Sequence, residues 1–310
     1  QQKIITIFGA TGAQGGGLAR AILSDKNSEF AVRAVTRDPN SDKAKELAAM
    51  GAEIVQADLA QPEKIFKAME GAYGAFCVTF FWAHFSPEQE AAEAKCMADA
   101  AKAAGVQHVI WSTLEDTRIL VPLEDNRMPT LMEKFKVPHF DSKGDSNHFF
   151  TDAGVPTTFL LTTFYWDNLI YFGMGPKRGE DGVLAITFPM ADKKLSGISA
   201  EDIGKCAYGI FKKGASQIGK TVGIAGEHIS CADMAKALTK AVRYNSVTPA
   251  MFRSFGFPGA EDLGNMFQYY QEFETEFTAA RDIDNARALN PELLSFDMWL
   301  AENAKRLPLS

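Results

Sequence analysis

Cysteine and histidine are scarce in this sequence, and their spacing argues against disulfide and metal frameworks. The four cysteines are far apart in the sequence and form no C-x-x-C pair: Cys77, Cys96, Cys206 and Cys231. Such spacing is typical of reduced, mostly buried thiols in an intracellular protein. The five histidines form no H-x-x-x-H pair and no cluster with cysteine. The sequence therefore predicts no metal site.

The chain also lacks an excess of positive charge and a long apolar run. Asp and Glu (39) outnumber Lys and Arg (32), for a net charge of -7. Because phosphate repels an acidic surface, direct nucleic-acid binding is not expected. The most apolar window, residues 72–85, is interrupted by His84 and is too short to span a bilayer. With no recognisable signal peptide, we expect no membrane attachment and a cytoplasmic protein, with nuclear entry left open.

The first half of the sequence instead shows a regular alternation of strand and helix patterns. Predicted strands at 3–8, 30–36, 53–56, 72–78 and 106–111 alternate with predicted helices at 18–23, 42–50, 63–69 and 87–104. The last of these helices has clear ends, because Ser86 can cap it, Pro87 suits its first position and Gly105 stops it. The series predicts an α/β fold, a Rossmann-type doubly wound parallel sheet covered by helices on both faces.

The pattern changes after residue 112. Residues 113–138 carry charges and three prolines without a strand period, which predicts either a functional or mobile loop or a tolerated surface insertion. A helix at 142–152 and a strand at 157–163 complete a predicted dinucleotide-binding domain, residues 1–163. Residues 164–310 predict a smaller, mixed and mainly helical lobe, interleaved with the first. Its predicted elements are a hairpin near 183–188 and helices at 200–212, 231–243, 249–255, 260–271 and 295–305.

A glycine-rich turn follows the first predicted strand. Gly9, Gly12 and Gly15 form a G-x-x-G-x-x-G motif just before the first predicted helix. Glycines here allow a tight turn, a close approach of the backbone to a pyrophosphate and close packing of helix on strand, while the helix N-terminus favours phosphate. At the first strand–helix junction of such a series, the motif predicts dinucleotide binding.

The ends of the following strands supply further candidate contacts. Arg37 ends the second strand, where NADP binders place an arginine for the 2′-phosphate, so we expect NADP(H) in preference to NAD(H). The alternative is a surface ion pair between Arg37 and Asp38. Residues placed to reach the adenine edge and the nicotinamide side are Asp58, Leu59, Thr79 and Phe80. Five aromatic residues predict either an apolar pocket over the nicotinamide or packing between the lobes: Phe81, Trp82, Phe164, Tyr165 and Trp166.

Eight segments together resemble the NmrA-like branch of the atypical short-chain dehydrogenase family. They are IFGATGAQGGGLA, RAVTRDP, GAEIVQADL, SPEQEAAEAK, HFDSKG, GVPTTFL, FYWDNL and GFPGAEDLGNMF, and the resemblance covers nearly the whole chain. That family includes NAD(P)-sensing regulators and NADPH-dependent reductases. The resemblance implies cofactor contacts at Gly9, Thr11, Gly12, Gln14, Gly15, Arg37, Asp58, Thr79, Lys95, Lys143, Phe164 and Tyr165, and we add the neighbouring Ala13, Leu59, Phe80 and Phe81 to the predicted site.

The sequence departs from the wider family at its proton-transfer motif, Tyr-x-x-x-Lys. The corresponding segment begins with His139 and ends with Lys143, so the lysine is present and the tyrosine is not. His139 is a candidate proton donor, and Lys143 could itself act through a lowered pKa. The alternative keeps Lys143 as a ribose-binding residue and His139 as a loop histidine. Ser112 and Thr113 occupy the region of the family's catalytic serine, where we expect them to line the cleft or cap the strand.

Two functions follow from a cofactor site beside an incomplete proton-transfer site. The first hypothesis, which the sequence favours by a small margin, is an NADP(H)-binding redox sensor or regulator with little or no dehydrogenase activity that acts through a partner protein. The second is an NADPH-dependent reductase of a small apolar or aromatic substrate that uses Lys143 and His139. The sequence leaves the oligomeric state open.

Overall fold

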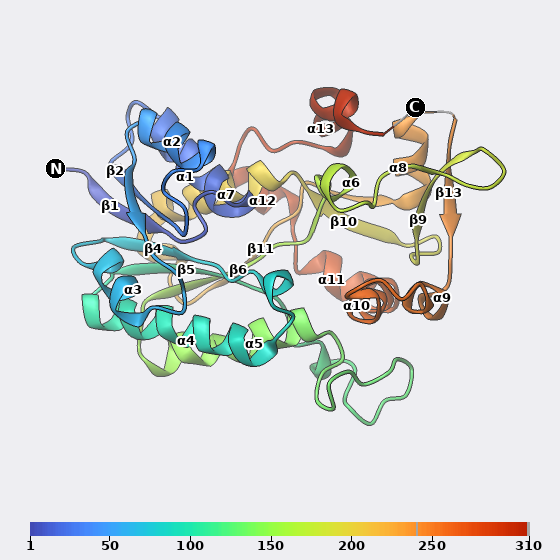
Figure 1. Cartoon of the computed structure of the whole chain (residues 1–310), viewed down its shortest axis with the longest axis horizontal. Coiled ribbons are helices and arrows are strands. Elements are labelled where there is room, and N and C mark those ends of the chain that lie inside the picture. The colour runs from blue at the N-terminus through green and yellow to red at the C-terminus, as the bar shows by residue number, and fades with distance from the viewer. Residues whose placement is uncertain (240, 309–310) are drawn as a thin grey trace.

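A parallel sheet forms the centre of the computed structural model, which describes residues 1–239 and 241–308 (Figure 1). Within these residues the sheet has seven strands, in the order β11-β6-β5-β4-β1-β2-β3, and every neighbouring pair is parallel. Its strands are β1 (Lys3–Ile7), β2 (Phe30–Thr36), β3 (Glu53–Gln56), β4 (Gly74–Cys77), β5 (His108–Thr113), β6 (Thr157–Leu161) and β11 (Thr221–Gly223). The first six strands follow the order of a doubly wound dinucleotide-binding sheet, as predicted.

Helices cover both faces of this sheet, which explains why β4 and β5 are buried along their whole length. One face packs against α1 (Ala13–Ser24), α7 (Ala200–Lys213) and α12 (Ile283–Leu289). The other packs against α3 (Pro62–Met69), α4 (Pro87–Ala104) and α5 (Pro138–Asp152). Figure 1 shows the two helical layers above and below the strands, with α2 (Asp42–Ala49) beside α1.

The predicted ends of α4 are confirmed. Ser86 Oγ accepts a hydrogen bond from the Gln89 N–H at 3.1 Å, and Pro87 is the first helical residue. Gly105 follows the last residue with a φ of 67°, a conformation that glycine adopts without steric cost.

The second part of the chain is mixed, with two small sheets and a group of helices. The sheets have the orders β12-β10-β7 and β13-β9-β8. Their strands are β7 (Phe164–Tyr165), β8 (Lys177–Arg178), β9 (Leu184–Phe188), β10 (Lys194–Ile198), β12 (Glu227–Ser230) and β13 (Val242–Ser246). The helices are α6 (Asn168–Tyr171), α8 (Cys231–Leu238), α9 (Pro249–Ser254), α10 (Ala260–Glu272), α11 (Glu274–Ala279) and α13 (Phe296–Asn303). Four short 3-10 helices are η1 (Phe81–Ala83), η2 (Thr117–Ile119), η3 (Gly214–Gln217) and η4 (Ala304–Arg306).

The chain crosses between the two parts more than once. After β7 and β10, it returns to the central sheet through α7 and β11, and later through α12. At the contact of α1 with α7, a Cβ on Gly204 would lie 2.0 Å from the Leu18 nitrogen, so glycine allows the two helices to touch. The predicted second lobe also includes residues 309–310, which lie outside the described residues.

Three predicted helix boundaries are wrong. The helix expected at 18–23 begins at Ala13, directly after the glycine turn. The helix expected at 231–243 ends at Leu238, and Val242 begins β13 instead, because that segment pairs in parallel with β9. Residue 240 of that prediction lies outside the described residues. The helix expected from residue 142 begins at Pro138, so His139 lies in the first turn of α5 and is not a loop histidine.

Candidate functional site

The glycine-rich turn lies at the carboxyl end of β1, where the order of the sheet reverses. The chain passes from β1 to β2 on one side, while β4 pairs with β1 on the other, and ligands of such sheets bind at this switch point. Gly9 has a φ of 59°, and Gly12 precedes α1 without a side-chain cap. The free N–H groups at the start of α1 are therefore available to an anion.

The turn has no room for larger residues at one key position. A Cβ on Gly15 would lie 2.4 Å from the Gly9 carbonyl oxygen, closer than real Cβ atoms approach. A Cβ on Gly12 would lie 3.1 Å from the same oxygen. Thr11 is half-buried beside the turn, and Ala13 is exposed as the first residue of α1. This arrangement fits the backbone-lined cradle that a pyrophosphate requires.

Arg37 and Asp58 lie along the same edge of the sheet as the glycine turn. Arg37 is exposed at the end of β2, and within residues 1–239 and 241–308 it forms no ion pair, so the alternative pairing with Asp38 does not occur. The half-buried Asp58 accepts a hydrogen bond from the Ala60 N–H at 2.8 Å. The adjacent Leu59 packs against the hydrophobic core on the α4 face of the sheet. The Arg37 guanidinium is thus free to meet an anion.

A chain of three polar side chains links the glycine turn to β5 and β7. Ser112 Oγ donates to Gln14 Oε1 at 2.7 Å, and Gln14 Nε2 donates to the Tyr165 hydroxyl oxygen at 2.5 Å. Burial raises the pKa of Tyr165 to about 12, so its hydroxyl stays protonated near neutral pH. The chain holds the side chain of Gln14 across the carboxyl edge of the sheet.

Lys143 lies on α5 and is fixed by a buried group that the sequence did not indicate. Its Nζ donates to Thr79 Oγ1 at 2.6 Å, to the Thr79 carbonyl oxygen at 3.2 Å and to Glu90 Oε2 at 2.9 Å. Glu90 is 1% exposed, and its carboxylate balances the lysine charge. The one available signal was the helical spacing of Glu90 with the buried Ala94 and Met97.

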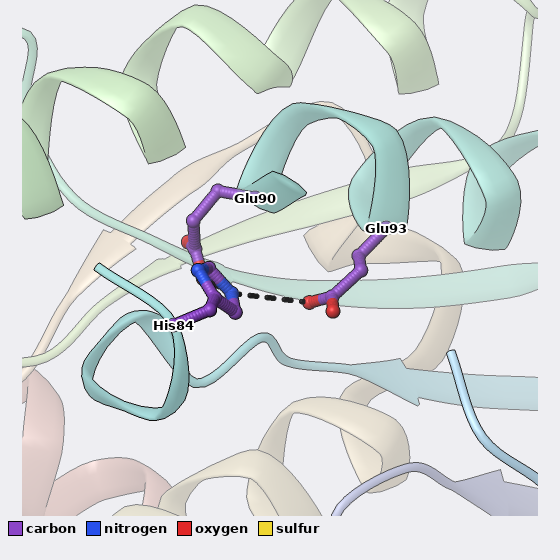
Figure 2. A group of neighbouring side chains, drawn as sticks. All are labelled: His84, Glu90 and Glu93. Atoms are coloured by element: carbon purple, nitrogen blue, oxygen red, sulfur yellow. Dashed lines mark ion pairs between the residues drawn. The ribbon is translucent and has the colours of Figure 1, made fainter. Parts of the chain in front are cut away.

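Glu90 also belongs to a second group of titratable residues, with His84 and Glu93 (Figure 2). His84 Nε2 lies 3.7 Å from Glu90 Oε1 and 3.8 Å from Glu93 Oε2. The Ser86 N–H donates to His84 Nδ1 at 3.0 Å, so the neutral ring carries its proton on Nε2. A histidine bound to a metal through Nε2 carries that proton on Nδ1 instead. The neutral ring therefore presents an N–H group, not a lone pair, to the two carboxylates, and the absence of a metal site stays a prediction.

His139 lies one turn before Lys143 on α5, and its ring is held from α10. Its Nδ1 hydrogen-bonds Asp262 Oδ1, and its backbone N–H donates to Asp262 Oδ2 at 3.1 Å. The His139 ring centroid lies 4.8 Å from that of Trp82 and 6.1 Å from that of Phe81, both in η1 after β4. His139 and Lys143 are therefore both on the carboxyl side of the sheet.

Three predicted contact residues do not join this group through their side chains. Lys95 lies on the solvent side of α4 and pairs with Asp99 at 2.5 Å. Phe164 is buried in the hydrophobic core of the second part of the chain, with its ring centroid 5.8 Å from that of Phe188. Phe80 is 55% exposed at the end of β4, beside the buried Phe81. The five aromatics thus divide three ways. Phe164 and Trp166 pack in the hydrophobic core of the second part of the chain, Phe81 and Trp82 contact His139, and Tyr165 accepts a hydrogen bond from Gln14.

These features define a Rossmann-type, dinucleotide-binding class of fold with a polar site at the switch point. The chain belongs to the NmrA-like family, whose model matches residues 1–300. The NmrA-like family domain-containing oxidoreductase FrzB of Cladobotryum sp is 30% identical to it, over 86% of this chain and 84% of that protein.

Solved structures agree with this assignment. A crystal structure of NmrA, a negative transcriptional regulator, in complex with NADP has a TM-score of 0.78 and 25% identity, covering 99% of both chains. A crystal structure of NmrA in complex with NAD also has a TM-score of 0.78 and 25% identity, over 98% of this chain and 95% of that one. Among the described residues, no helix combines the length and apolarity needed to cross a membrane.

Proposed function

We propose that this protein is an NADP(H)-dependent reductase of a small apolar or aromatic substrate. The observation that carries the proposal is the position of His139, a candidate proton donor that lies beside the aromatic residues of η1 and one turn before Lys143 on α5. The relative with 30% identity that is named an oxidoreductase supports the same function. The order of the two hypotheses from the sequence is thereby reversed.

The residues of the switch point fit a bound NADP(H). We propose that the turn from Gly9 to Gly15 holds the pyrophosphate, that Arg37 pairs with the 2′-phosphate, and that Asp58 and Leu59 reach the adenine. On the nicotinamide side, the residues are Gln14, Thr79, Phe81, Lys143 and Tyr165. When bound, NADPH supplies a hydride to the electrophilic carbon of the substrate.

The chain's own residues then position the substrate and supply the proton. The rings of Phe81 and Trp82 provide an apolar wall beside His139, which suits a flat, uncharged substrate. His139 gives the proton from Nε2 to the substrate oxygen, and Lys143 holds the ribose from its place between Thr79 and Glu90.

A steady-state assay of NADPH oxidation tests this proposal. The substrates are a panel of aromatic aldehydes, ketones and quinones, and the variants are His139→Ala and Lys143→Met, with His148→Ala on the exposed face of α5 as the control. We expect His139→Ala to lower kcat about 10²–10⁴-fold and His148→Ala to leave it unchanged. Equal turnover in wild type and both site variants would contradict the proposed roles.

The sensor hypothesis remains the second candidate, because Tyr-x-x-x-Lys is incomplete and the similar NmrA structures are of a transcriptional regulator. A sensor must bind NADP(H) with different affinities in two conformations and report them to a partner protein or through a change of oligomer. Undetectable turnover across the panel, together with tight NADPH binding, would favour it. For either function we propose a cytoplasmic location, in agreement with four free cysteines.

A further inference from the structure

We propose that Asp262 is a positioning residue that holds the Nδ1–H of His139, so that the protonated ring donates to a substrate from Nε2. The inference rests on the proposed reductase function. It also gives a role to the GFPGAEDLGNMF segment, which contains Asp262 but contributes no residue to the predicted cofactor contacts.

The contact between the two residues fixes the tautomer. The Asp262 carboxylate forms two hydrogen bonds with His139, one to the ring Nδ1 and one to the backbone N–H. A carboxylate only accepts hydrogen bonds, so the ring proton lies on Nδ1 and Nε2 is left to exchange a proton with a substrate. Within the described residues, His139 Nε2 has no hydrogen-bond partner.

Burial and helix geometry keep this contact in place. His139 is 7% exposed and Asp262 is 6% exposed, so water competes little for either group. Asp262 lies in the first turn of α10, where the helix dipole favours its negative charge. Gly259, which precedes α10 with a φ of 90°, allows this approach, since a Cβ there would lie 2.8 Å from Trp82 Cζ3.

The proposed step balances as a two-electron reduction of a carbonyl. The hydride forms a C–H bond at the carbonyl carbon as the C=O π bond breaks. The His139 ring, protonated at both nitrogens, gives its Nε2 proton to the oxygen to form the hydroxyl group and becomes neutral with its remaining proton on Nδ1. Bound NADPH would supply the two electrons as the hydride, and solvent returns a proton to Nε2. Asp262 stabilises the ring in its charged form and keeps Nε2 directed away from α10.

A purely structural tie between α5 and α10 is the alternative role for this contact. An asparagine at position 262 tests the difference, because its oxygen can still accept from the His139 backbone N–H while its NH₂ group faces Nδ1. The ring must then adopt the opposite tautomer, with the proton on Nε2 when neutral. A structural tie would survive this change, whereas a positioning role would not.

The experiment compares wild type, Asp262→Asn and the matched control Glu261→Gln, which removes a neighbouring exposed charge from the same turn. The measurements are kcat, KM, NADPH affinity by calorimetry, and the ring tautomer of His139 by ¹⁵N NMR, assigned with His139→Gln. For Asp262→Asn we expect kcat to fall about 10²–10⁴-fold while NADPH affinity changes less than about threefold. We expect the ring proton to move from Nδ1 to Nε2 in this variant only.

Two results would overturn the proposal. One is a neutral His139 ring in the wild type that carries its proton on Nε2, which NMR detects without a substrate. The other is an Asp262→Asn variant that keeps wild-type kcat, or that loses kcat and NADPH binding together. Absence of turnover in the wild type, with the Nδ1–H tautomer present, would instead overturn the reductase function alone.

Discussion

His108 shows how a single buried side chain can make the stability of this protein depend on pH. It begins β5 and is fully buried, with Nε2 2.8 Å from Thr158 Oγ1. The Thr158 hydroxyl donates to the Gln217 carbonyl oxygen at 2.8 Å, so the histidine is the donor to Thr158 and its Nδ1 carries no proton. Among residues 1–239 and 241–308, Nδ1 has no hydrogen-bond partner. Burial lowers the pKa of His108 to about 4, and the ring is neutral in the folded protein near pH 7.

The lowered pKa predicts a loss of stability in acid. As the pH falls below about 6.5, the unfolded chain binds a proton at His108 before the folded chain does. The contribution is therefore complete above about pH 6.5 and is lost as the pH falls towards 4. Between pH 7 and 4.5 we expect His108 to remove about 2–3 kcal/mol from the free energy of unfolding.

Urea unfolding at the two pH values measures this effect. For His108→Gln, the free energy of unfolding should differ correspondingly less between pH 7 and 4.5, whatever its value at pH 7. The exposed His148→Gln serves as the control and should behave as wild type. An unchanged pH difference in His108→Gln would show that other groups cause the acid sensitivity.

Arg37 carries the predicted preference between the two cofactors. Because a guanidinium pairs with phosphate through two charge-assisted hydrogen bonds, Arg37→Ala should weaken NADPH binding about 10–100-fold. NADH binding should change less than about threefold, since NADH has no 2′-phosphate. Calorimetry with NADPH, NADP⁺, NADH and NAD⁺ checks this, with Arg178→Ala, an exposed arginine on β8, as the control. Equal losses for NADPH and NADH would argue that Arg37 binds another part of the cofactor.

For single residues, the sequence predicts a role where that role depends on the residue's position next to the end of a strand. Gly9 and Arg37 are of this kind, because each lies within two residues of the carboxyl end of a strand of the parallel sheet. Glu90 and Asp262 are not, because their contacts join residues 53 and 123 positions apart. Such contacts depend on how α4, α5 and α10 meet, which no local pattern records.

At the scale of elements, the junction of β1 with α1 restricts residue size at Gly15. Gly15→Ala would place a Cβ 2.4 Å from the Gly9 backbone oxygen, which cannot move without disturbing the turn. The neighbouring Gly16→Ala would meet the flexible Arg20 guanidinium at 3.1 Å and the Ala10 oxygen at 3.3 Å, so a small shift accommodates it.

The two substitutions are therefore a matched pair. We expect Gly15→Ala to lower the free energy of unfolding by about 1–3 kcal/mol and to abolish measurable NADPH binding. Gly16→Ala should change stability by less than about 1 kcal/mol and retain binding. Thermal unfolding and calorimetry measure both. NADPH binding by Gly15→Ala at wild-type affinity would mean that the turn does not hold the pyrophosphate.

Elements follow from the sequence where periodicity and end signals agree. The residues that begin and end α4 are an example, because Ser86, Pro87 and Gly105 each supply a separate local reason. The predicted C-terminal end of α8 and the predicted start of α5 are wrong for two different reasons. Pairing of β13 with β9 overrides helical spacing after Leu238, and Pro138 starts α5 although charged and aromatic residues there hide the periodicity.

At the scale of the whole molecule, residues 114–137 connect the two parts of the chain. Asn265 on α10 donates to the Pro129 carbonyl oxygen at 2.9 Å and to the Lys136 carbonyl oxygen at 2.6 Å. Asp141 on α5 accepts from the backbone N–H groups of Thr117 at 2.8 Å and Val137 at 3.0 Å. The segment is therefore anchored at both ends and is not a loose surface insertion.

This anchoring separates the two candidate functions. A sensor that uses the segment as its moving element would change tryptic cleavage after the exposed Arg127 and Lys134 when NADPH binds. A reductase needs no such change, so we expect the cleavage rate with saturating NADPH to stay within about twofold of the free protein. Asn265→Ala supplies the positive control. In this variant the carbonyl groups of Pro129 and Lys136 lose their hydrogen-bond donor, which costs about 1–3 kcal/mol of local stability. Cleavage should therefore accelerate about tenfold or more. If NADPH strongly slowed or accelerated tryptic cleavage of this segment in the wild type, the sensor would be favoured, because a ligand shifts a conformational equilibrium only by binding the two conformations with different affinities.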